Sequence, residues 1–92
     1  MRVRFRVTAA NILLATSYAQ QNGLVDPARC PIALALQRRL GARDCSVEPD
    51  DGLAYVDGRP WALSEAAIDF AHLFDLEDAE RPVKPATFVV WE

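Results

Sequence analysis

Cys30 has the clearest potential for covalent chemistry, because it directly precedes Pro31 at the expected start of a helix. A thiol at a helix N-terminus can have a lowered pKa and act as a nucleophile. Its partner base would have to be His72, the single histidine of the chain. A buried, unreactive cysteine is the commoner fate of this residue type. Because the sequence also lacks a phosphate-binding glycine loop and a nucleophile elbow, we interpret the protein as non-enzymatic.

Metal and cofactor chemistry has little support in the composition. Cys30 and Cys45 are the two cysteines, and together with His72 they are too few for a recognisable zinc site. They are also too few for a disulfide framework, so both thiols are expected to be reduced. The sequence therefore predicts no metal and no cofactor.

Charged residues are distributed unevenly along the 92 residues, whose net charge is −3. Residues 1–43 contain seven arginines and one acid, a net charge of +6. Residues 44–92 contain three basic and twelve acidic residues, a net charge of −9. The two halves could interleave in space and neutralise each other, or they could leave one basic and one acidic face.

Acidic residues gather in two segments that are expected to be loops. Carboxylates on a small rigid domain can occupy a basic, nucleic-acid-binding surface of a partner, standing where phosphates would bind. Trp61, together with Tyr55, is predicted to anchor this interface. The simpler alternative is that the acids keep the domain in solution. The predicted partner-binding residues are Glu48, Asp50, Asp51, Trp61, Asp75, Glu77, Asp78 and Glu80.

Residues 2–7 alternate arginine with apolar side chains. This period of two predicts a strand whose arginines line the face away from the core, about 6.5–7 Å apart. Such a row is often a solvated face or a protected sheet edge. It can also bind phosphates, so nucleic-acid binding is the alternative function. The residues predicted for that alternative are Arg2, Arg4, Arg6, Arg38, Arg39 and Arg43.

These residues must be positioned by helices and strands of one domain. A chain of 92 residues supports one hydrophobic core, which predicts a single domain over residues 1–92. Thr8 is expected to cap a helix over residues 9–20 that stops near Gly23. Pro31 suits the first position of a second helix, which Gly41 ends. Residues 45–48 and 53–57 predict a hairpin, because Asp51-Gly52 between them is a turn signal.

The C-terminal part is expected to begin with a turn over residues 57–60, and a short connecting segment, residues 61–63, joins this turn to Ser64. Ser64 is expected to cap a helix over residues 65–75. Residues 76–85 are acidic and interrupted by proline, which predicts a loop. Residues 86–91 are apolar on both faces, which predicts a strand inside the sheet. The fold class is therefore α+β, with the order β-α-α-β-β-α-β: a small mixed, mainly antiparallel sheet with helices on one face.

The first residues contain no continuous apolar run, so neither a signal peptide nor a membrane span is expected. A cytoplasmic location is the default that follows.

Short motifs along the chain resemble small open reading frames common in phages and prophages. They are Cys30-Pro31-Ile32-Ala33-Leu34-Ala35-Leu36, Ala67-x-x-Phe70, Phe74-Asp75 and Pro85-x-x-Phe88. The chain departs from that group by an insertion over residues 12–29 and by an extended acidic loop after residue 75. The resemblance implies a phage accessory function in a bacterial host, a class that includes anti-CRISPR proteins, and it transfers no catalytic residue.

Charge segregation, small size and this resemblance together predict an inhibitor or adaptor that binds a host protein or nucleoprotein complex, such as a CRISPR effector, through acidic loops. Direct nucleic-acid binding by the arginines is the alternative.

Overall fold

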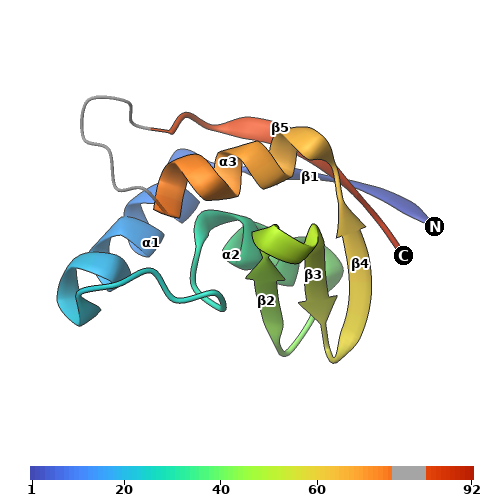
Figure 1. The fold of residues 1–92 in the computed structure, drawn as a ribbon, viewed down its shortest axis with the longest axis horizontal. Helices are drawn as coiled ribbons and strands as arrows, with labels where there is room; N and C mark the ends of the chain where they lie inside the picture. The colour runs from blue at the N-terminus through green and yellow to red at the C-terminus, as the bar shows by residue number, and fades with distance from the viewer. Residues whose placement is uncertain (76–82) are drawn as a thin grey trace.

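Five strands and three α-helices make up the part of the chain that the computed structural model describes, residues 1–75 and 83–92 (Figure 1). The α+β class and the order of the predicted elements are confirmed. The elements are β1 (Arg2–Val7), α1 (Ala9–Asn22), α2 (Pro31–Leu40), β2 (Cys45–Glu48), the 3-10 helix η1 (Pro49–Asp51), β3 (Leu53–Val56), β4 (Arg59–Leu63), α3 (Glu65–Asp75) and β5 (Ala86–Trp91).

The sheet has the strand order β1-β5-β4-β3-β2, and each of its pairings is antiparallel. β5 pairs with β1 along its whole length but with β4 only through Ala62–Trp91 and Leu63–Val90. Figure 1 shows the consequence: β1 and β5 run together toward the two chain ends, while β2, β3 and β4 run across that direction. β5 therefore lies inside the sheet, as its apolar sequence predicts.

β4 is a strand that the sequence analysis did not predict, because Pro60 argues against a central strand. Only the end of β4 pairs with β5, so Pro60 faces no strand on that side and its missing N–H costs no bond there. Asp57 and Gly58 have φ values of 50° and 83°, as a two-residue type I′ hairpin turn requires. This Asp-Gly pair is the sequence signal that could have revealed β4.

The helix ends follow the predicted signals. Thr8 Oγ1 accepts a hydrogen bond from the Asn11 N–H at 3.2 Å, which caps α1. Cys30 Sγ accepts one from the Ala33 N–H at 3.5 Å, with Pro31 at the first position of α2. Gly41 ends α2 in the left-handed conformation, at φ 64°. Cys30 and Pro31 thus start a helix that packs into the core.

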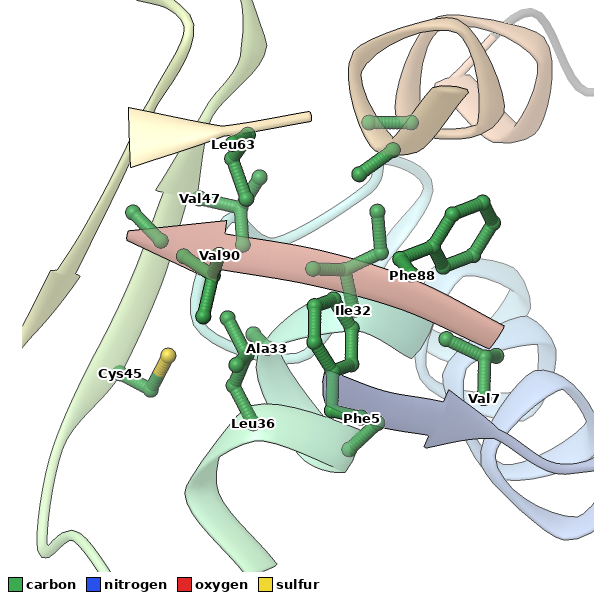
Figure 2. Close-up of a cluster of buried hydrophobic side chains, with 14 of the residues drawn as sticks. Phe5, Val7, Ile32, Ala33, Leu36, Cys45, Val47, Leu63, Phe88 and Val90 are labelled. Carbon is green, nitrogen blue, oxygen red and sulfur yellow. The ribbon is translucent and has the colours of Figure 1, made fainter. Parts of the chain in front are cut away.

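The hydrophobic core lies between the sheet and helices α2 and α3. Figure 2 shows Phe5 of β1, Leu36 of α2 and Phe88 of β5 gathered there. The Phe88 ring lies 5.9 Å from that of Phe5 and 5.2 Å from that of Phe70, measured between centroids. Since alternate side chains of β1 and β5 enter this core, the side chains between them lie on the opposite, uncovered face.

Candidate functional site

An acidic cleft lies where η1 meets the C-terminal end of α3. The chain leaves β2 at Glu48, forms the single turn of η1, and enters β3 after Gly52, whose φ of 70° is left-handed. His72 Nε2 of α3 lies 3.8 Å from Asp50 Oδ1. These contacts bring Asp75, the last residue of α3, into the same neighbourhood as Asp50, 25 residues earlier in the sequence.

The cleft has a volume of about 470 Å³ and is lined by three separate parts of the chain. The loop between α1 and α2 contributes exposed Leu24 on one side. Three buried residues lie at the base: Cys30, Val47 and Ala71. The lining also includes three acidic residues: Glu48, Asp50 and Asp75. An apolar base with an acidic rim suits a cation on an apolar stem.

The electrostatics of Asp75 reflect this crowding. Burial raises the pKa of the Asp75 carboxyl above its ordinary value, and the nearby Asp50 carboxylate raises it further. His72 acts in the opposite direction and lowers that pKa. A cation entering the cleft would therefore relieve a cost that Asp75 bears when it is ionised.

The predicted acidic residues divide into two groups. Glu48, Asp50 and Asp75 come together in the cleft, and Asp51 lies beside them in η1, exposed to solvent. The remaining predicted contacts fall outside the described residues: Glu77, Asp78 and Glu80.

Trp61 does not have the position predicted for it, and its assignment as an interface anchor is wrong. Its side chain is only 6% exposed, because the alternation along β4 points Trp61 and Leu63 into the core. The exposed aromatic residues are Tyr55, the other residue predicted as an anchor, at 37%, and Trp91, at 41%. The unrecognised strand β4 explains the error, since without its period of two the side on which Trp61 lies could not be derived.

The arginines predicted for nucleic-acid binding occupy different elements. Three of them, Arg2, Arg4 and Arg6, share the exposed face of β1. Arg38 and Arg39 lie in the last turn of α2, and Arg43 follows that helix. Arg39 reaches the edge of β1, where its Nε donates to the Arg4 carbonyl oxygen at 3.2 Å.

Sequence reasoning missed the aromatic neighbour of this row. The register of β1 and β5 places Trp91 directly opposite Arg2. Trp91 was recognisable as a strand residue, but only the pairing shows that its side chain and the arginines share a face.

The two thiols are free and buried. Burial raises the pKa of Cys30 to about 11, and the bond from the Ala33 N–H lowers it only in part. Burial likewise raises the pKa of Cys45 to about 12. The shift at Cys30 is opposite to the one that a nucleophile needs, so its geometry supports the interpretation as a helix start.

Residues 1–75 and 83–92 contain neither a cluster of side chains that could hold a metal ion nor a helix that could span a membrane. Within these ranges no three Cys, His, Asp or Glu side chains lie close enough to hold a metal ion. Within the same ranges, no helix combines the length and the apolar character needed to cross a membrane.

Comparisons with protein-family models, with curated proteins and with solved structures gave no match.

Proposed function

We propose that this protein is a non-enzymatic inhibitor or adaptor that binds a basic surface of a partner protein through the acidic cleft. The observation that supports this function is the convergence of Glu48, Asp50 and Asp75 around an apolar base. A surface that only keeps a domain in solution needs scattered charge and no such base. The cleft combines the two properties that a protein interface needs, an apolar centre and a polar rim.

The chemistry of the cleft favours lysine or arginine side chains of the partner. Both residue types have an apolar stem, which fits the base of Cys30, Val47 and Ala71, and a charged head, which fits the rim. An arginine can in addition form paired hydrogen bonds with one carboxylate. A partner segment with one or more exposed basic residues is therefore the ligand that the cleft suits best.

Nucleic-acid-binding surfaces are rich in such residues. On this proposal the protein acts in a bacterial host, as a phage-type accessory protein, on a nucleoprotein complex such as a CRISPR effector. Its carboxylates take the places of phosphates on that surface, and bound protein excludes the nucleic acid.

A quantitative pull-down from bacterial lysate tests the proposal. We expect wild-type protein to capture a partner with a basic surface, and the variant Asp50→Asn/Asp75→Asn to capture about tenfold less of it. A matched control, Glu65→Gln/Asp69→Asn, removes the same charge from exposed positions of α3 outside the cleft lining. Capture that is unchanged in the cleft variant, or reduced equally in the control, contradicts the proposal.

A further inference from the structure

The side chains of β1 and β5 that point away from the core form a second surface, named the open face. Its members are Arg2, Arg4, Arg6, Thr87, Val89 and Trp91. In the antiparallel register Arg2 lies opposite Trp91, and Arg4 lies opposite Val89. Side chains directly opposite each other in such a pair have Cβ atoms about 4.5–5.5 Å apart. The open face thus sets a row of guanidinium groups against an exposed indole.

Protection of a sheet edge does not explain this combination. β1 is an edge strand, and charged side chains on an edge discourage pairing with another chain. Part of that edge is already occupied, because Arg39 donates to the Arg4 carbonyl oxygen. Trp91 lies on β5, inside the sheet, where no edge needs protection. An exposed indole between charged side chains is a feature of binding surfaces.

The arginines of the open face are also available to a ligand. In the part of the chain that the structure describes, the single close contact between a basic side chain and a carboxylate joins His72 to Asp50. Within those residues no carboxylate therefore neutralises the guanidinium groups of Arg2, Arg4 and Arg6, and all three side chains are exposed.

We propose that the open face binds single-stranded nucleic acid. The row of arginines follows the phosphates, since neighbouring arginines on one side of a strand are about 6.5–7 Å apart and can each reach a different phosphate. Trp91 stacks on a base, as aromatic side chains do on surfaces that bind single strands. A single strand is the ligand because the faces of its bases are accessible, whereas in a duplex they are stacked. This surface is separate from the acidic cleft, so the inference goes beyond the proposed function.

The net charge of −3 does not prevent this binding. β1 and β2 lie at opposite edges of the sheet, and none of the acidic residues that line the cleft belongs to β1 or β5. At physiological ionic strength the Debye length is about 8 Å. Charges around η1 are therefore largely screened from a phosphate on the open face, and the local row of arginines dominates.

Fluorescence anisotropy of a labelled oligothymidylate of about 15 nucleotides, a length within the usual site sizes, tests the inference. Three phosphate contacts predict a slope of about −2 for log affinity against log salt, so affinity falls about 20-fold between roughly 50 and 200 mM salt. Absence of binding at the lower salt concentration overturns the inference. Equal affinity for a duplex of the same length also overturns it.

Two triple variants distinguish the open face from general charge. Arg2→Gln/Arg4→Gln/Arg6→Gln is expected to weaken binding at least tenfold and to flatten the salt dependence. The control Arg29→Gln/Arg59→Gln/Lys84→Gln removes the same charge from exposed residues outside the open face. It is expected to bind within about twofold of wild type. Equal weakening in both variants contradicts the proposed surface.

Two substitutions of Trp91 test whether its ring stacks on a base. Trp91→Phe keeps an aromatic ring and should retain most of the affinity, whereas Trp91→Leu should lose about tenfold. Circular dichroism and thermal melting show whether each variant is folded, and Trp91→Phe keeps the test decisive if Trp91→Leu unfolds. Equal affinity of the two variants overturns the stacking role. The cleft variant Asp50→Asn/Asp75→Asn should bind the oligonucleotide as wild type does, so the two proposals can fail separately.

Discussion

The open face and the acidic cleft are built in different ways. The open face comes from one antiparallel strand pair, whose alternation puts every second side chain on the same side. The cleft comes from three parts of the chain that meet only in the folded protein: the loop before α2, the β2–η1 segment and α3. A surface set by a local period is visible in the sequence, whereas a surface set by convergence is not. The difference also predicts how each surface responds to substitution.

The largest expected effect comes from the core that supports the open face. Phe88 lies on the inner side of β5 and contacts the rings of Phe5 and Phe70. Phe88→Ala should lower the free energy of unfolding by about 3–5 kcal/mol, since it leaves a cavity. The neighbouring control Thr87→Ala, on the exposed side, should change it by less than about 0.5 kcal/mol. Urea unfolding measures both, and similar losses would show that the two sides of β5 are not distinct.

The reactivity of the Cys30 thiol shows whether reagents in solution can reach the base of the cleft. Its pKa of about 11 means that the reactive thiolate is scarce at neutral pH. Alkylation by iodoacetamide at about pH 8 should be more than 100-fold slower in the folded protein than in urea, because an ordinary thiol has a pKa of about 8.5. Peptide mass spectrometry separates modification of Cys30 from that of Cys45. Rapid alkylation of the folded protein at Cys30 would show an open, reactive thiol and would revive the nucleophile hypothesis.

Substitutions in each surface should impair the binding activity of that surface and leave the other activity unchanged. Asp50→Asn/Asp75→Asn should reduce partner capture about tenfold and leave oligonucleotide binding unchanged, while the arginine variant of the open face should do the reverse. A tenfold change corresponds to about 1.4 kcal/mol of binding free energy. If either variant impairs both activities in a folded protein, the surfaces are coupled and the comparison between them fails.

The smallest expected effect is the pH dependence that Asp75 contributes. Its pKa is raised in the folded protein, so the folded state favours the neutral carboxyl more than the unfolded chain does. The stability that this group contributes is present below the unfolded pKa and is lost as pH rises through the folded pKa. As the pH rises from about 3 to about 7, the free energy of unfolding of Asp75→Asn should therefore increase relative to that of wild type, by roughly 0.5 kcal/mol or less. A relative loss over that range would mean that Asp75 is stabilised as a carboxylate.

Most of the fold was predictable because its signals are local. Thr8, Pro31 and Gly41 mark helix ends by their own backbone chemistry, and the alternation in β1 assigns each side chain to a face. β4 was missed because Pro60 suggested a turn, although Asp57-Gly58 signals a hairpin. The position of Trp61 depended on that strand, so its predicted role as an anchor failed with it.

The sequence by itself determined which residues are acidic, which arginines share a strand face and where the helices begin, since each of these follows from neighbours within a few positions. Only the tertiary structure decided that Asp50 and Asp75 border one cleft and that Trp91 lies beside Arg2. Strand register and helix packing bring together residues that are distant in the sequence. Both are selected by burial of the whole core, which no short segment contains.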